Sequence, residues 1–398
     1  MIVDGLKLPS PEMSLSTHKL SFNKFALGLI LLAIFAGQLI KIPIGGSGGP
    51  AVIDIVVLLL DAILLFRYKF KLPKPPVFVK PATVFIIIAI ISLLLSPLSL
   101  TNSERLIGFF YTVRFSSIIL LGWLLNFSAI KTLLISGVVL SVLGLLQFIF
   151  IPDLGFLTPA GWDYHYFRTV STFLDPNFLG AYLTLTMLLI YQSCNFKNRF
   201  HFIIFIITYL ALLTTFSRGA YLAFLVAFLT LSILKKSLKL GLVTILLFAL
   251  LMISFMAYHQ EVAEPRGIDR GSSAEARLDT WQQGLQMFLQ QPVLGVGFNV
   301  YRVALKEYKL SDEGFLSSHG AGSNDSSLLF VAATTGIIGL IAYCFFLASI
   351  AWQGFKKNPT LLAGLLGLLA QSFFANILFF PYILLWLILN LCYYEEHE

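Results

Sequence analysis

Twelve apolar runs follow one another along most of this chain, separated by short polar segments. A helix needs roughly 20 mostly apolar residues to cross a bilayer, and most of the runs come close to that length. They cover approximately 25–43, 51–67, 82–98, 107–126, 131–151, 177–194, 200–216, 219–234, 239–258, 326–350, 359–376 and 377–393. The pattern therefore predicts an all-α integral membrane protein with about 12 transmembrane helices.

One long polar segment interrupts the runs and divides the chain into three regions. Residues 1–258 carry the first nine predicted transmembrane helices, 259–325 form a loop, and 326–398 carry the last three helices and a tail. Inside the loop, Leu278, Trp281, Leu285 and Phe288 recur at helical spacing. We expect an amphipathic helix at about 273–290 that lies at the membrane interface.

The lysines and arginines predict the orientation of these helices. With the N-terminus inside, the short inner segments and termini hold 16 of the 27 basic residues and the short outer loops hold four, Lys41, Arg105, Arg168 and Arg218. This bias follows the positive-inside rule, in which long loops do not count. We therefore expect a multi-pass protein of the cytoplasmic membrane, with both termini cytoplasmic and the long loop outside.

The composition agrees with a membrane protein, since 58% of the residues are hydrophobic, 12% are charged and the mean hydropathy is +0.86. The net charge of +7 is explained by the predicted cytoplasmic segments, so nucleic acid is not indicated as a partner. The three cysteines are far apart in the sequence and predict neither a disulfide framework nor a metal site.

The sequence "TTFSRGAYLAF" places Arg218 at the start of a predicted helix, after Ser217 as a candidate cap. A cation is unfavourable at that end of the helix dipole unless an anion joins it. Backbone amides and a guanidinium together suit a phosphate group. The alternative is an arginine that reaches lipid phosphates at the interface.

Three further polar clusters flank predicted helices on the same side. "FRTVSTFLDPNFLGAYL" contains Arg168, Asp175 and Asn177, and Asp175-Pro176 is also typical of a helix start. Arg277 lies in the first turns of the loop helix, where Glu275 or Asp279 is an alternative partner to an anion. "SSHGAGSNDSSLLF" brings His319, Asn324, Asp325 and Ser326 to the start of the tenth run. Asp325 and Ser326 are equally candidates for a helix cap, whereas a base beside an anion-binding site is what group transfer needs.

These stretches, in this order, resemble the O-antigen ligase/polymerase family of membrane glycosyltransferases. The resemblance rests on "STFLDPNFLGAYL", "FSRGAYLAF", "RLDTWQQGLQMFLQQPVLGVGFNVYR" and "DSSLLFVAATTGIIGL", and covers roughly residues 165–345. It implies a metal-independent, inverting transfer on the outer membrane face, with a polyprenyl-diphosphate-linked glycan as donor and no cofactor. It implies that Arg218 and Arg277 bind the diphosphate, and Arg168 is a further candidate.

In ligases of this family, the last motif opens with His followed by Asn, Ser or Gln, and nine further residues separate this pair from Gly-x-x-Gly. Gly336-Ile-Ile-Gly339 fixes that register here, so Asp325-Ser326 stands where His-Asn is expected. This difference favours a polymerase of glycan repeat units, with a glycan or lipid-linked glycan as acceptor and a chain-length regulator as an additional partner. Asp325 is the expected base, with a pKa lowered by the nearby cations, and His319 is the alternative.

Two other functions are compatible with parts of the pattern. A ligase that transfers the glycan to lipid A-core belongs to the same family. An anion or bicarbonate transporter would carry ionisable residues at mid-span near broken helices. Only Asp61 and Arg114 are expected clearly within spans, which favours chemistry at one membrane surface.

Overall fold

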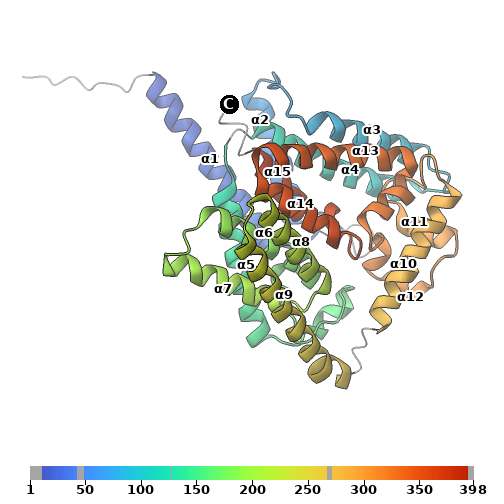
Figure 1. The fold of residues 1–398 in the computed structure, drawn as a ribbon. Helices are drawn as coiled ribbons and strands as arrows, with labels where there is room; N and C mark the ends of the chain where they lie inside the picture. Colours follow the sequence, from blue (N-terminus) through green and yellow to red (C-terminus); the bar gives the residue numbers. More distant parts are fainter. Residues whose placement is uncertain (1–10, 43–48, 126, 267–270, 393–398) are drawn as a thin grey trace, which may run out of the picture.

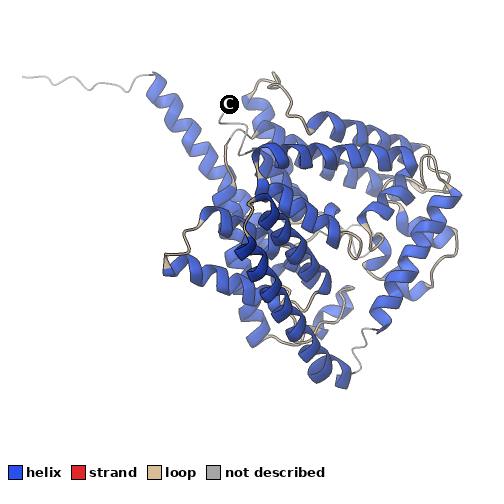
Figure 2. Cartoon of the chain, viewed as in Figure 1, coloured by secondary structure: helices blue, strands red, loops and turns tan. Residues whose placement is uncertain are grey.

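The computed structural model describes residues 11–42, 49–125, 127–266 and 271–392, and these residues form helices joined by loops and contain no β-strand (Figure 2). The predicted all-α class is confirmed. The helices are α1 (Pro11–Ala36), α2 (Val52–Arg67), α3 (Val79–Leu94), α4 (Asn102–Leu124), α5 (Ile130–Phe150), α6 (Pro176–Ser193), α7 (Arg199–Leu213), α8 (Arg218–Leu234), α9 (Leu238–Tyr258), α10 (Gly271–Gln290), α11 (Tyr301–Glu307), α12 (Glu313–Ser317), α13 (Ser327–Lys357), α14 (Pro359–Gln371) and α15 (Pro381–Cys392).

Each predicted apolar run overlaps one of these helices, including the runs that are separated by only a few residues. Residues 214–217 separate α7 from α8, and residues 372–380 separate α14 from α15. Four segments are long and apolar enough to cross a membrane by length and composition, namely Asn102–Leu124, Ile130–Phe150, Leu238–Arg266 and Gly320–Lys357. Several other apolar helices are shorter, so the number of twelve transmembrane helices stays a prediction.

Helices α6, α8 and α14 pack closely in the centre of the molecule (Figure 1). A Cβ atom added to Gly180 of α6 would lie 2.4 Å from the Cβ of Ala220 in α8, and one added to Gly367 of α14 would lie 2.6 Å from the carbonyl oxygen of Ala223. Small residues allow helix backbones to approach in this way where lipid supplies no hydrophobic driving force. This packing fixes the position of the first turn of α8.

The connections at one end of the helices contact one another directly. The amide of Gln38, after α1, donates to the carbonyl of Thr172 at 2.7 Å, and Thr169 donates to Thr214 at 2.9 Å. At the start of α13, Ser327 donates to Ser372, after α14, at 2.9 Å. The segments 37–42, 152–175, 214–217, 320–326 and 372–380 therefore gather at the same end, which is the end where the predicted topology places outer loops.

Helix α13 is broken at Gly336, whose φ of 65° and ψ of −168° are not helical. The turn after α10 fills the break. The amides of Val296 and Gly297 donate to the carbonyls of Ala333 and Thr334, each at 3.0 Å, and Ile337 donates to Pro292 at 2.8 Å. These bonds supply partners for groups that the helix leaves unpaired, as a break at membrane depth requires. Thr335, Gly336 and Ile337, at the break, carry no ionisable group.

We expect Gly336→Ala to destabilise the protein strongly. A Cβ there would lie 2.2 Å from the carbonyl oxygen of Val293, and the positive φ is unfavourable for alanine. The loss of unfolding free energy should exceed about 2 kcal/mol, measured by denaturation in detergent micelles. Gly28→Ala in α1 is the matched control, because a Cβ at Gly28 would meet no atom within 4 Å. Equal stability of the two variants would contradict a break at Gly336 in the folded protein.

Candidate active site

Arg218 is the first residue of α8, and the turn before it is ordered by side chains. Ser217 caps the helix, its hydroxyl oxygen accepting a hydrogen bond from the amide of Ala220 at 3.3 Å. The same hydroxyl donates to Oδ1 of Asn177 at 2.7 Å, which ties the start of α8 to the start of α6. The Arg218 side chain is exposed, with its guanidinium 5.4 Å from the centre of the Phe255 ring.

Arg168 holds the turn from which Arg218 projects. Its Nε donates to the carbonyl of Thr215 at 2.9 Å and its Nη2 to the carbonyl of Phe216 at 3.3 Å. Phe216 has a φ of +47°, unusual for a residue with a side chain, and its ring stacks on Tyr258 at 4.1 Å. These contacts give Arg168 a positioning role, and its direct contact with a diphosphate stays a prediction.

Asp175 and Asn177 lie at the start of α6, where Asn177 contacts this turn through Ser217. Oδ1 of Asp175 accepts hydrogen bonds from the amides of Asn177 at 2.6 Å and Phe178 at 3.1 Å, so Asp175 caps α6. Burial raises the pKa of Asp175 to about 6, although the two backbone amides oppose that shift. The carbonyl of Asn177 accepts a hydrogen bond from Gln371 of α14 at 2.9 Å. Asn177 thus connects α6 with α8 and α14 at the end where Arg218 lies, and Asp175 caps α6 beside it.

The start of α13 is tied to α10 by the residues that the sequence singles out. Asn324 is fully buried. Its side-chain Nδ2 donates to the backbone carbonyl of Thr280 and, at 2.9 Å, to the Tyr301 hydroxyl. Ser326 caps α13, accepting a hydrogen bond from the amide of Leu329 at 3.4 Å. Asn324 and Ser326 therefore position Asp325, which lies between them in the sequence.

Asp325 faces α10 and lies within electrostatic reach of Arg277. The Thr280 hydroxyl is 3.1 Å from Oδ2 of Asp325 and donates to it. The positive charge of Arg277 acts both on the Asp325 carboxylate and on the guanidinium of Arg218. Arg277 makes no salt bridge to Glu275 or Asp279, whose side chains the structure describes. The structure thus brings Arg218, Arg277 and Asp325 together from three separate segments.

The expected direction of the Asp325 pKa is wrong. Burial raises the pKa of this carboxyl above its usual range, and the nearby negative charge of Asp163 acts in the same direction. The hydrogen bond from Thr280 and the charge of Arg277 offset only part of the rise. Sequence reasoning counted the cations but not the loss of hydration, which disfavours the charged form. A higher pKa makes Asp325 a stronger base than expected.

His319 lies against the loop that precedes α6. Its Nδ1 is 2.5 Å from the carbonyl oxygen of Gly161, and its ring stacks on Trp162 with centroids 4.7 Å apart. His319 lines a cavity together with Lys41, Arg114 and Arg302. This environment is distinct from the contacts of Asp325 with α10. The role of His319 as an alternative base stays a prediction.

Helix α10 packs on α13 through a face that differs from its apolar stripe. Thr280, Gly284 and Met287 are buried, whereas Leu278 and Leu285 of the predicted stripe remain 57% and 49% exposed. An exposed apolar stripe on a helix that is anchored by its other face is compatible with the predicted contact between this helix and the bilayer.

The sequence reasoning missed several charged or aromatic residues near these groups. Asp54, in the first turn of α2, forms a salt bridge with Arg114 of α4 at 2.6 Å. The expectation that only Asp61 and Arg114 lie clearly within spans stays a prediction. Asp163 acts electrostatically on both Asp325 and Asp175. The sequence offered one signal for Asp54, namely that a charged residue lies inside the second apolar run. Trp162 and Asp163 stood in a loop without any distinguishing motif.

The fold and this site together define a helical membrane protein whose polar groups converge at one end of the helices. Residues 203–344 match the family model described as O-antigen ligase. This match confirms the resemblance seen in the motifs for residues 203–344, which are similar to the O-antigen ligase/polymerase family. The matched region includes Arg218, Arg277 and Asp325. A search of curated proteins found no match.

Proposed function

We propose that this protein is a polymerase that transfers glycan repeat units from a polyprenyl-diphosphate donor to a growing glycan. The observation that carries the proposal is the convergence of Arg218 and Arg277 beside Asp325, within the region that matches the family. Two guanidiniums suit the paired phosphates of the donor. The single carboxylate next to them suits the hydroxyl of an acceptor sugar.

The proposed reaction is a direct displacement that inverts the anomeric carbon. The acceptor hydroxyl attacks the anomeric carbon of the donor sugar while the bond from that carbon to the diphosphate oxygen breaks. The bonding electrons leave with the diphosphate, where Arg218 and Arg277 stabilise the developing negative charge. Asp325 accepts the hydroxyl proton. Arg168, Ser217 and Asn177 act by holding the turn that presents Arg218.

The polymerase and the ligase differ in their acceptor, and reconstitution separates them. The protein in lipid nanodiscs is given a polyprenyl-diphosphate-linked repeat unit, alone or with lipid A-core. A ladder of longer lipid-linked glycans in the first reaction supports the polymerase. Transfer only when lipid A-core is present would identify a ligase instead. The absence of transfer in both reactions, together with anion uptake by proteoliposomes, would favour the transporter.

The proposal requires the loop between α9 and α13 to lie outside the cytoplasmic membrane. In a background without Cys194, Cys344 and Cys392, we expect Glu275→Cys to react with an impermeant maleimide added to intact spheroplasts. Lys236→Cys, in the exposed turn between α8 and α9, should react only after lysis. The motivation is the distribution of 16 basic residues in predicted inner segments against four in short outer loops. The opposite labelling pattern would overturn the orientation and the proposed function with it.

A further inference from the structure

A second cationic site lies near the proposed active site, in a cavity of about 220 Å³. Lys41, Arg114, Arg302 and His319 line it, and the described lining residues include no aspartate or glutamate. None of the family motifs quoted above assigns a role to Lys41 or Arg114. Arg114 belongs to α4, whereas Arg302 belongs to α11, so the cations come from distant parts of the sequence.

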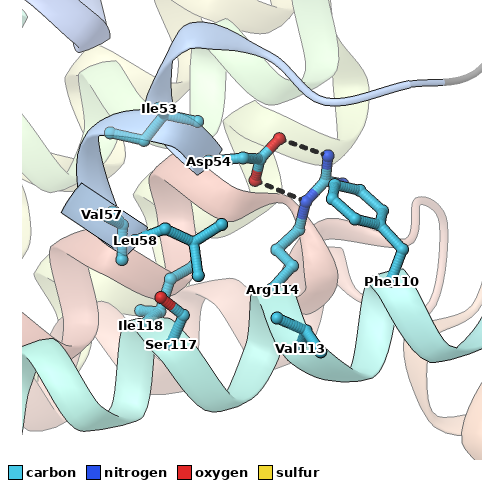
Figure 3. A pocket seen from close by; sticks show the side chains of 9 residues that line it. All are labelled: Ile53, Asp54, Val57, Leu58, Phe110, Val113, Arg114, Ser117 and Ile118. Carbon is cyan, nitrogen blue, oxygen red and sulfur yellow. Dashed lines mark hydrogen bonds and ion pairs between the residues drawn. The ribbon is translucent and has the colours of Figure 1, made fainter. Parts of the chain in front are cut away.

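Arg114 is held rigidly with part of its guanidinium left for a ligand. Its Nε and Nη2 donate to the two carboxylate oxygens of Asp54, each at 2.6 Å, and Figure 3 shows this paired arrangement. Nη2 is also 3.4 Å from the carbonyl of Gly49. Among the described residues, Nη1 has no hydrogen-bond partner. One buried carboxylate therefore fixes the orientation of Arg114, and Nη1 remains available to another acceptor.

Lys41 contributes a further positive charge close to Arg114. Its Nζ lies 4.5 Å from the centre of the Trp162 ring, a cation–π contact that holds the side chain in place. Burial and, to a smaller extent, the positive charge of Arg114 lower the pKa of Lys41 to about 8, while Asp54 opposes the shift. The cavity thus carries an excess of positive charge that a bound anion would relieve.

A larger cavity of about 820 Å³ continues from this site. The two cavities share Gly49, Tyr111, Arg302 and Gly322 in their linings. The larger cavity is lined by α4, α12, α11 and the residue before α11. Its wall is largely apolar, with Leu106, Ile107, Phe110, Val300, Val303 and Leu316, and also includes the charged residues Glu104, Lys306 and Glu313. A cationic pocket that opens into an apolar cavity of this size suits an amphiphile with an anionic head and a hydrocarbon chain.

We propose that these two cavities bind the acceptor of the reaction through the phosphate group of its lipid carrier. Lys41, Arg114 and Arg302 would contact the phosphate, and the apolar cavity would hold the first part of the chain. This inference rests on the proposed function for the role of acceptor, since the site itself selects a phosphorylated lipid. The segment Gly161–Asp163 lies between the two sites, because Trp162 contacts Lys41 and His319 while Asp163 acts on Asp325. A glycan on the bound lipid would need to pass this segment to reach Asp325.

The test counts bound lipid on the full-length protein in nanodiscs. The probe is farnesyl diphosphate, and native mass spectrometry gives the number of equivalents bound. We expect two equivalents on the wild-type protein. Lys41→Met and Arg302→Gln, tested separately, should each weaken one of them by about tenfold or more. Arg105→Gln is the matched control on α4, because Arg105 is half-buried, donates to the Leu94 carbonyl and is not among the lining residues of either cavity. Arg114 is left intact, since its loss would leave Asp54 buried without a partner.

The outcomes separate this inference from the proposed function. If Lys41→Met and Arg302→Gln both keep two equivalents, and both variants melt like the wild type, the acceptor site is wrong. If Arg218→Gln with Arg277→Gln keeps two equivalents while Lys41→Met keeps one, the second site stands and the donor site is wrong. Purified lipid A in competition identifies the carrier. Displacement of the Lys41-dependent equivalent by lipid A supports a phosphorylated-lipid site that serves a ligase, whereas resistance to lipid A supports a prenyl-phosphate site.

Discussion

Arg218→Ala and Arg277→Ala should each lower the rate of glycan transfer by at least about 10²-fold while the protein stays folded and inserted. The reason is the charge that develops on the diphosphate as its bond to the sugar breaks. Arg218 is exposed and Arg277 half-buried, so neither variant removes a side chain from a tightly packed core. The measurement is the initial rate of extension of lipid-linked glycan by purified protein.

Lysine at either position should restore little of this rate, because a point charge cannot make the paired contacts of a guanidinium. Arg266→Ala serves as the control. Arg266 is an exposed arginine near the start of the same predicted outer loop, where it lies over the Tyr166 ring at 4.3 Å. Wild-type rates in both the Arg218 and Arg277 variants would show that these arginines contact only lipid headgroups.

Asp325→Asn is expected to lower turnover by about 10²–10⁴-fold with the affinity for the donor largely kept. The amide keeps the size of the carboxylate and an acceptor for the Thr280 hydroxyl, but it cannot take a proton at neutral pH. His319→Ala should be milder, because the described contacts of His319 are with Gly161 and Trp162. A nearly inactive His319→Ala beside an active Asp325→Asn would reverse the assignment and favour a ligase-like mechanism.

The pH dependence provides a second readout for the same residue. A base must be deprotonated to act, and burial raises the pKa of Asp325 above that of an ordinary aspartate. The rate of the wild-type protein should therefore fall as the pH is lowered through this raised pKa, at a higher pH than for a solvent-exposed carboxylate. Asp325→Asn should abolish that part of the profile. A wild-type rate that stays constant down to the ordinary range of aspartate would contradict the assignment.

The helices were predictable because the apolar runs directly encode segments that avoid water, and short polar breaks such as the one before Arg218 mark their ends. The break in α13 was not predictable. Gly336 alone signals flexibility, and the break depends on Val296 and Gly297, which come from a loop about forty residues earlier. A contact of that range leaves no periodic pattern in the sequence.

Part of the site was predictable for a different reason. Arg218 stands out because a cation begins a helix, and Asp325 because of its spacing from Gly336. The interpretation of Arg168 was incomplete, since its bonds to the carbonyls of Thr215 and Phe216 depend on how two loops meet. Lys41 could have been found from its rarity, because it is one of only four basic residues in the predicted short outer loops. That Lys41 and Arg302 line the same cavity could be seen only in the folded structure.

The break at Gly336 also constrains how many residues the half-helix before it can contain. The loop after α10 fixes one end of residues 327–335, and the bonds of Asn324 and Asp325 to Thr280 fix the other end to the same α10. Removing one residue from this half-helix would rotate its ends by about 100° relative to each other. Asp325 would then turn away from Thr280, or the loop would lose its bonds at the break.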